Sequence, residues 1–237
     1  MILGTDGNKM SKSKGNVVNP DHVVEQYGAD TLRVYEMFMG PLDASIAWSE
    51  NGLESTRRFL DRIWRLYVAE DGSLSERIQD AENPALERVY HQTVKKVTED
   101  YEILHFNTAI SQMMIFLNAT KDQAIIPKAY AQGLIQLLAP LAPHISEEIW
   151  QKLGHQDSIS HVAWPSYEEA LTIEDQVEVV VQINGKIKAK VMVEANMAAD
   201  ALGELALNLP EIQAQLEGKT LRKVVAIPNR LVNIVAN

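Results

Sequence analysis

The spacing of apolar residues in the middle of the chain constrains the fold more than any other feature. From about residue 50 to 153, apolar side chains recur at intervals of three and four and are interrupted at turn residues. This period is typical of amphipathic helices that bury one face each. The stripes that we expect in the core are Phe59, Ile63 and Leu66; Leu86, Val89, Val97 and Leu104; Ile110, Met114 and Leu117; and Leu134, Leu138 and Leu141. Together they predict an antiparallel helical bundle.

Turn residues divide the chain into elements on both sides of these stripes. Asn19-Pro20 predicts a short helix that ends at Gly28, and Asp30 is expected to cap the next helix, which Gly40-Pro41 stops. Inside the bundle, Asn83-Pro84, Asn107 and Pro127 mark helix starts. Pro140 and Pro143 predict a break before a last short helix that ends at Gly154.

A β-hairpin is predicted close to the C-terminus. Two alternating runs, QVEVVVQI and KIKAKVMVE, flank Asn184-Gly185, the dipeptide that best favours a two-residue hairpin turn. A helical stretch near 198–217, broken at Pro210, precedes two further strands around Pro228-Asn229. These elements predict a small ββαββ-like α/β domain, joined to the bundle by a linker at residues 155–175.

Composition and charge limit the classes of function. The chain has 46% hydrophobic residues and a net charge of −10, which argues mildly against RNA, because RNA-binding domains are commonly basic. Any RNA site must therefore be a local basic stripe on an acidic body. The absence of cysteine excludes thiolate zinc sites, and the six histidines lack metal-ligand spacing, so we expect no metal. No apolar run is long enough for a membrane span, so a cytoplasmic location is expected.

The most informative segment is KMSKS, residues 9–13, followed by Lys14, Gly15 and Asn16. Lysines and hydroxyls on a glycine-flanked loop supply positive charge and hydrogen-bond donors to a polyphosphate. A generic lysine cluster is more often a solvated loop. Because residues 1–16 have almost no periodic hydrophobicity, we expect a mobile loop here.

This loop and most of the chain resemble the bacterial-type leucyl-tRNA synthetases, a family of class I aminoacyl-tRNA synthetases. KMSKS is the signature of that class, and further blocks are similar to leucyl-tRNA synthetases in order and spacing. The blocks are YGADTLRVYEMFMGP, AWSENGLESTRRFLDRIWRL, HFNTAISQMMIFLNA, LLAPLAPHISEEIWQKLG, VVVQINGKIKAKV and LRKVVAIPNRLVNIV. Valyl and isoleucyl relatives share the loop and bundle, but the QINGK hairpin resembles the leucyl type.

The resemblance implies a leucine–tRNA ligase as the parent protein. In this family ATP, with Mg²⁺, and leucine form leucyl-adenylate, and the leucyl group then passes to leucine tRNA. Lys9 and Lys12 would steady the β,γ-phosphates of ATP, Met10 would pack near the adenine side, and Ser11 and Ser13 would shape the loop. Positioning and charge stabilisation would dominate this chemistry.

The family's N-terminal catalytic and editing domains have no counterpart in this sequence. We therefore expect a part of a longer chain that binds tRNA but does not charge it unaided, with a natural split protein as the alternative. Two rival functions stay open: a non-catalytic RNA-binding or regulatory module derived from a synthetase tail, and an acidic protein-interaction domain with a vestigial loop. The corresponding part of a valyl or isoleucyl synthetase is a further alternative.

Two basic stripes are the candidate RNA sites. Arg58, Arg62 and Arg65 share one helix face. Such a row is usually a solvated face, and Glu54 and Asp61 lie close enough in the sequence to pair with it. Lys186, Lys188 and Lys190 alternate along a strand and should point to one side while Ile187, Ala189 and Val191 point to the core. Arg222 and Lys223, with Lys219 and Arg230, extend the second stripe.

The sequence thus predicts a multidomain, mainly α protein. Residues 1–45 form the KMSKS loop and stem segment of a class I catalytic domain. Residues 46–165 form an α-helical bundle of the anticodon-binding type. Residues 173–237 form a small α/β tRNA-binding domain.

Overall fold

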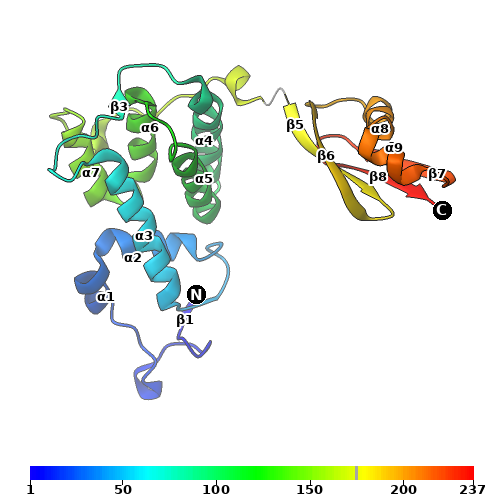
Figure 1. The fold of residues 1–237 in the computed structure, drawn as a ribbon. Helices are drawn as coiled ribbons and strands as arrows, with labels where there is room; N and C mark the ends of the chain where they lie inside the picture. The colour runs from blue at the N-terminus through cyan, green and yellow to red at the C-terminus, as the bar shows by residue number, and fades with distance from the viewer. Residues whose placement is uncertain (174–175) are drawn as a thin grey trace. The chain divides into compact units, whose positions relative to one another are not determined.

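The computed structural model describes residues 1–173 and 176–237, and the chain divides into two compact units, residues 1–172 and 173–237 (Figure 1). The part of the predicted linker at residues 174–175 lies outside the described residues. Each unit has its own hydrophobic core. The units are therefore described separately.

The first unit is mainly helical, with short strand pairs at its edges. Its helices are α1 (Pro20–Tyr27), α2 (Ala29–Phe38), α3 (Glu50–Tyr67), α4 (Pro84–Glu102), α5 (Phe106–Ala119), α6 (Lys128–Leu138) and α7 (Pro143–Lys152), with 3₁₀ turns η1 (Lys12–Lys14), η2 (Ile159–His161) and η3 (Glu169–Thr172). Two parallel pairs join β1 (Ile2–Leu3) to β2 (Ile46–Ala47) and β3 (Ile78–Gln79) to β4 (Ile126–Pro127). In Figure 1, α3 runs from the stem at the N-terminal end into the bundle.

The predicted apolar stripes form the core of this unit. Ile63, Leu86, Val97 and Ile110 are among the buried residues, together with most of the other expected positions. A smaller cluster of Val23, Tyr35, Trp48 and Leu53 lies around α1, α2 and the start of α3. The bundle and the stem segment therefore belong to one compact unit.

Local capping explains where several helices begin. The side chains of Asn19, Ser49 and Asn83 accept hydrogen bonds from the first-turn backbone amides of α1, α3 and α4. Proline at the first position of α1 and α4 costs no helical hydrogen bond, because the N–H of any residue at this position has no partner within the helix. The predicted starts of α1 and α4 are thus confirmed.

Two predictions about single residues in this unit are wrong. Leu104 was expected in the core but is 55% exposed, because the chain turns there with a φ of 61° between α4 and α5. Asp30 was expected to cap α2, but α2 begins one residue earlier and Gly28 is its N-cap. Its carboxylate serves another helix, as the site geometry shows.

The segment after α7 packs on the bundle where we expected a linker. Gln136 donates to the carbonyl of Ala163, and Glu168 donates its backbone N–H to His91. Lys95 and Glu169 form an ion pair. Residues up to 172 therefore belong to the first unit.

The second unit is a four-stranded sheet with two helices on one face. The elements are β5 (Gln176–Ile183), β6 (Lys186–Glu194), α8 (Ala199–Leu207), α9 (Pro210–Leu216), β7 (Leu221–Ile227) and β8 (Leu231–Ala236), in the strand order β6-β5-β8-β7. The Asn184-Gly185 turn has φ values of 49° and 76°, as the hairpin prediction requires. Val179, Val181, Val232 and Ile234 are buried with Leu202 and Ile212 of the helices. The predicted ββαββ-like domain is confirmed.

A close helix contact at Gly133 gives a stability prediction. A Cβ added to Gly133 would collide with the hydroxyl oxygen of Tyr90, whose ring stacks on Tyr130 at 4.2 Å. We expect Gly133→Ala to lower the free energy of unfolding by about 1–3 kcal/mol through overpacking, measured by urea denaturation. In a chain that already carries Tyr90→Phe, adding Gly133→Ala should lower the free energy of unfolding by less than it does in the parent chain. An unchanged stability for Gly133→Ala would contradict the tight packing.

Candidate nucleotide- and RNA-binding sites

The KMSKS loop presents its lysines to solvent and anchors itself on the stem. Lys9 and Lys12 are exposed and form no ion pair with the described residues. Met10 is half-buried and packs on the cluster around Tyr35 and Trp48, so its side chain faces the stem core. The hydroxyls of Ser11 and Ser13 lie 3.2 Å apart. The loop can therefore offer two unpaired ammonium groups to an anion.

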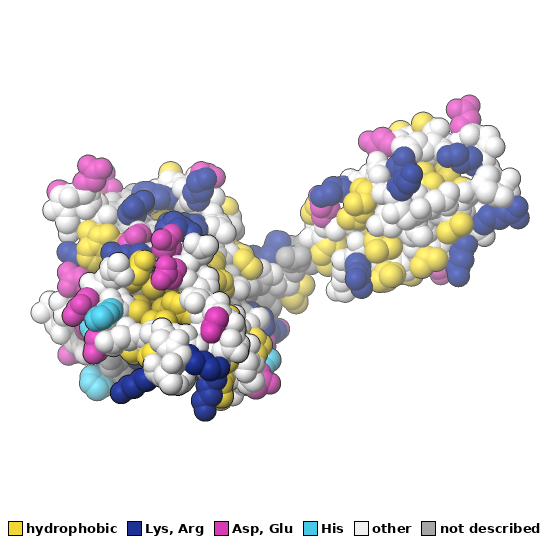
Figure 2. All heavy atoms as spheres, turned by 90° about the horizontal axis from the view of Figure 1, so that it is seen from below, with side chains coloured by type: hydrophobic (Ala, Val, Ile, Leu, Met, Phe, Trp, Pro, Cys, Tyr) yellow, Lys and Arg dark blue, Asp and Glu magenta, His cyan; other side chains and the backbone are white. Residues whose placement is uncertain are grey.

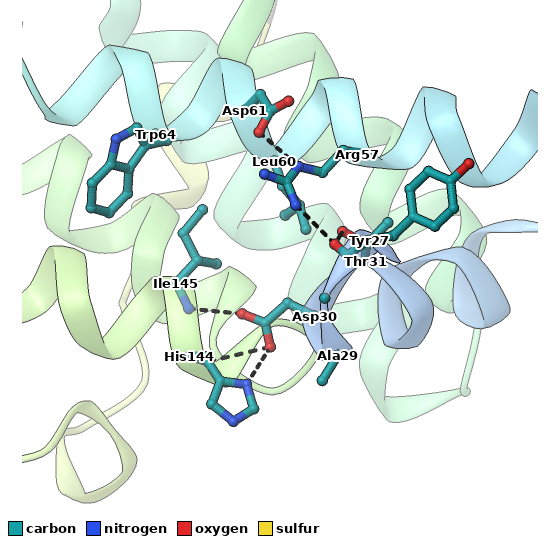
Figure 3. Close-up of a pocket in the computed structure, with 11 residues that line it drawn as sticks. Tyr27, Ala29, Asp30, Thr31, Arg57, Leu60, Asp61, Trp64, His144 and Ile145 are labelled. Atoms are coloured by element: carbon teal, nitrogen blue, oxygen red, sulfur yellow. Dashed lines mark hydrogen bonds and ion pairs between the residues drawn. The ribbon is translucent and has the colours of Figure 1, made fainter. Parts of the chain in front are cut away.

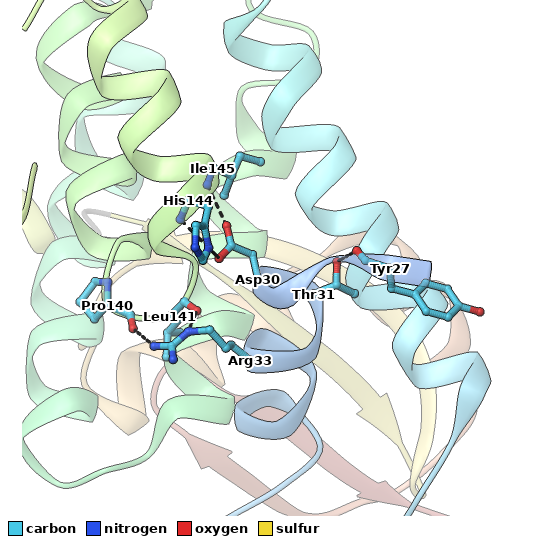
Figure 4. Close-up of polar contacts among 8 residues, drawn as sticks. All are labelled: Tyr27, Asp30, Thr31, Arg33, Pro140, Leu141, His144 and Ile145. Atoms are coloured by element: carbon cyan, nitrogen blue, oxygen red, sulfur yellow. Dashed lines mark hydrogen bonds and ion pairs between the residues drawn. The ribbon is translucent and has the colours of Figure 1, made fainter. Parts of the chain in front are cut away.

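Two residues of α2 hold the junction between α6 and α7 (Figure 4). Arg33 donates from Nε to the carbonyl of Leu141 at 3.0 Å and from Nη2 to that of Pro140 at 2.9 Å. Asp30 accepts the backbone N–H groups of Ile145 at 2.7 Å and His144 at 3.3 Å. The N-cap of α7, Ala142, has no capping side chain. Asp30 thus caps α7 from more than 100 residues away in the sequence.

A pocket of about 500 Å³ lies beside this junction (Figure 3). Its charged side chains already have partners. Arg57 bonds Asp61 at 2.9 Å and the carbonyl of Tyr27 at 2.9 Å, and Asp30 bonds the first turn of α7. Trp64, Leu60 and Ile145 complete its wall. We therefore interpret this pocket as part of the packing contact between the stem and the bundle.

The arginines predicted on one face of α3 have different surroundings. Arg58 lies 3.6 Å from Glu54 and bonds the hydroxyl of Ser55. Arg62 donates to the side-chain oxygen of Asn118 on α5. Arg65 is exposed and, with Arg62, lines a hollow of about 160 Å³. Asp61, which we expected beside these arginines, pairs with Arg57 instead.

This hollow also brings in two cations that the sequence did not single out. Arg77 and Lys121 line it, and none of the described residues lining it is acidic. Arg77 donates to the carbonyls of Thr120 and Gln123, so it also neutralises the C-terminal end of α5. Arg77 and Lys121 lie 15 and 59 residues beyond Arg62 in the sequence, so helical spacing could not reveal them. Their common signal is a positive charge in a turn that follows an amphipathic helix.

The predicted lysine stripe of the hairpin is interrupted by a β-bulge. The register passes from Val181 opposite Ala189 to Gln182 opposite Ile187, which leaves Lys188 as the extra residue. Ile187 is 62% exposed, so the expectation that it points to the core is wrong. Lys190 lies opposite Val180, on the face away from the helices, while Lys186 lies opposite the buried Ile183.

Strand pairing places part of the second basic stripe on the same open face. Lys223 of β7 lies opposite the exposed Val235, away from the buried Ile234, whereas Arg222 falls at a register shift and bonds the side chain of Asn237. Exposed Ile187, Met192, Val225 and Ile227 accompany the lysines. In Figure 2 the second unit presents hydrophobic side chains with Lys and Arg spread around them. This open sheet face therefore carries exposed apolar side chains together with lysines, of which Lys190 pairs with Glu178 at 2.8 Å.

Metal sites and membrane spans are both absent from the described residues. Over residues 1–173 and 176–237, no group of three or more His, Cys, Asp or Glu side chains is arranged to hold a metal ion. In the same residues, no helix combines the length and apolarity that a membrane crossing requires.

Comparisons with known proteins identify the class of protein. Residues 1–49 match the model of class I tRNA synthetases for isoleucine, leucine, methionine and valine. Residues 84–202, half of the chain, match the model of the anticodon-binding domain of tRNA ligases. The chain therefore belongs to the class I tRNA ligases that carry this anticodon-binding domain.

A solved structure agrees with the leucyl type within this class. The chain is similar to the leucyl-tRNA synthetase of Agrobacterium radiobacter in a ternary complex with tRNA and LeuAMS. The identity is 32% and the TM-score 0.74 over 100% of this chain. The match covers 33% of that synthetase, so the chain spans about a third of its length. The resemblance to leucyl-tRNA synthetases predicted from the sequence is confirmed.

The capping of α7 by Asp30 can be tested by substitution. Asp30→Ala removes a charged acceptor from two backbone amides in a nearly buried position, so we expect a loss of about 2 kcal/mol in the free energy of unfolding. Asp21→Ala, in the exposed first turn of α1, is the control and should change stability by less than about 0.5 kcal/mol. Equal effects of the two substitutions in urea denaturation would show that Asp30 is no more than a surface carboxylate.

Proposed function

We propose that this chain is the ATP-loop and tRNA-binding portion of a leucine–tRNA ligase. The observation that carries the proposal is the union, within one compact unit, of a complete KMSKS loop with a bundle of the anticodon-binding family. The likeness to a leucyl-tRNA synthetase favours leucine over isoleucine and valine. Its partners would be leucine tRNA and, in the complete enzyme, ATP and leucine. A cytoplasmic location belongs to the same proposal.

The chemistry proposed for the complete enzyme has two steps. The carboxylate of leucine attacks the α-phosphate of ATP and expels pyrophosphate, and a terminal ribose hydroxyl of tRNA then takes the leucyl group from the adenylate. Lys9 and Lys12 would meet the β,γ-phosphates, because both ammonium groups are exposed on the loop. Negative charge grows on the leaving pyrophosphate, so fixed cations there lower the barrier. Magnesium would accompany ATP, and we assign no residue of this chain to it.

ATP–pyrophosphate exchange tests the catalytic half of the proposal. We expect no leucine-dependent exchange from this chain alone, because the leucine and adenine pockets of the family lie outside it. In the complete synthetase, Lys12→Ala should lower the exchange rate at least about 100-fold, as loss of a charge contact to the transition state does, with tRNA affinity nearly unchanged. Exchange by the chain alone, or equal losses in both assays, would overturn this assignment.

Two surfaces are proposed to contact tRNA phosphates. One is the hollow of Arg62, Arg65, Arg77 and Lys121, where cations gather without a lining carboxylate. The other is the open sheet face of the second unit, whose lysines suit phosphates. On a chain with a net charge of −10, such local cations would have to supply the attraction.

The bulge in the hairpin provides a matched test of the second surface. Lys190 lies on the open face and Lys188 is the bulged residue near it, so replacing both with Ala should flatten the log–log salt dependence of tRNA binding by about 0.9 per lost contact. Lys186→Ala is the control, because Lys186 pairs opposite a buried residue of the other face. Both variants should stay folded by circular dichroism. If the double variant binds leucine tRNA with an unaltered salt slope, the RNA contact must be sought at Arg62 and Arg65.

A further inference from the structure

The KMSKS loop is closed by the side chain of Asn16, which follows it in the sequence. The Oδ1 atom of Asn16 accepts the backbone N–H of Ser11 at 2.8 Å. Its Nδ2 group donates to the carbonyl of Lys9 at 3.4 Å. One amide therefore bonds the backbone of the loop on both sides of Met10. Asn16 is less exposed than Lys14 and Gly15 beside it.

Asp6 holds Asn16 from the segment before the loop. Nδ2 of Asn16 lies 3.2 Å and 3.3 Å from the two carboxylate oxygens of Asp6. Asn8 donates to the same carboxylate from its backbone N–H at 3.0 Å and its side chain at 3.1 Å. These donors, those of Asn8 first, lower the pKa of Asp6 below its usual value. The two ends of the loop are thus joined by polar side chains.

Gly4 leaves the room that this arrangement needs. A Cβ added to Gly4 would lie 2.8 Å from Oδ1 of Asp6 and 2.9 Å from Nδ2 of Asn16. The backbone N–H of Gly4 bonds the carbonyl of Asn8 at 2.8 Å. We call Gly4, Asp6, Asn8 and Asn16 the clasp.

The clasp changes what a lysine-rich loop can do. A free loop must lose backbone entropy each time its two lysines converge on one phosphate group. A loop already fixed at Ser11 and Lys9 loses less backbone entropy. A larger part of the lysine–phosphate attraction can then lower the activation free energy. Met10 adds an apolar anchor on the stem core. The expectation of a mobile loop at residues 1–16 did not include these contacts.

We propose that Asp6 and Asn16 are positioning residues that hold residues 9–13 in the conformation from which Lys9 and Lys12 reach the phosphates of ATP. This inference rests on the proposed function of the loop. Neither residue need touch ATP. Their effect passes through the backbone at Lys9 and Ser11, to which Asn16 is bonded.

An exchange of the two side chains distinguishes positioning from a merely local turn. Asn16→Asp alone sets two carboxylates against each other where an amide met a carboxylate, so the clasp should open. Asp6→Asn alone keeps an acceptor for Asn8 and should weaken the clasp mildly. Asp6→Asn combined with Asn16→Asp again pairs an amide with a carboxylate and keeps an acceptor for Ser11. The combined variant should therefore recover the pairing with residue 6 that Asn16→Asp loses, but not the bond to the carbonyl of Lys9, which needs the amide of Asn16.

The first measurement needs only this chain and no activity. Amide hydrogen exchange at Ser11, followed by NMR, should accelerate about tenfold or more in Asn16→Asp and return toward the parent rate in the combined variant. Asn51→Asp, an exposed asparagine on α3, is the control and should leave Ser11 unchanged. Unchanged exchange at Ser11 in Asn16→Asp would show that no clasp exists.

The second measurement is ATP–pyrophosphate exchange by the complete synthetase. Asn16→Asp should lower kcat about tenfold, equivalent to about 1.4 kcal/mol, with the KM for leucine unchanged, and the combined variant should recover most of it. If Ser11 exchange responds but kcat does not, the clasp is structural only and the inference fails. If Lys9→Ala and Lys12→Ala also leave kcat unchanged, the proposed function of the loop fails as well. The lysine variants therefore separate the two failures.

Discussion

The architecture of the first unit depends on the hydrogen bonds between α2 and the α6–α7 junction. A chain that breaks between two helices leaves carbonyls without partners at the end of the first and amides without partners at the start of the second. Arg33 meets the carbonyls of Pro140 and Leu141, and Asp30 meets the amides of His144 and Ile145. The charges have the signs that the two helix dipoles favour. One turn of α2 therefore joins the stem, which carries the loop, to the bundle.

Much of this fold could be predicted from local signals, because these signals act within a few residues. Periodicity located the buried stripes of α3 and α6, and Asn184-Gly185 located the hairpin. The errors arose where distant contacts decide. Asp30 stands where the sequence suggests a local N-cap, yet its carboxylate oxygens accept hydrogen bonds from amides 114 and 115 residues away. A bulge has no reliable sequence signal, and it moved Ile187 out of the core.

The candidate sites were predictable to a smaller extent for the same reason. The KMSKS string marked its own lysines, but the role of Asn16 follows from a backbone path that brings it onto Ser11. Arg62 and Arg65 were visible as a helical row, whereas Arg77 and Lys121 join them only through folding. Spacing also suggested that Asp61 neutralises the row, and the pairing with Arg57 leaves Arg65 available. Residue type and spacing thus indicate candidates, and tertiary contacts decide which charges remain free.

The short pairing of β1 with β2 has a mechanical consequence. Backbone hydrogen bonds from Ile46 to Met1 and from Trp48 to Leu3 tie the entry of the KMSKS loop to the residues just before α3. An 18-residue helix is about 27 Å long, so a tilt of about 5° at its base displaces its far end by about 2 Å. Arg62 and Arg65 lie toward that far end. Through α3, the entry of the KMSKS loop is thus connected to Arg62 and Arg65, the candidate RNA-binding cations.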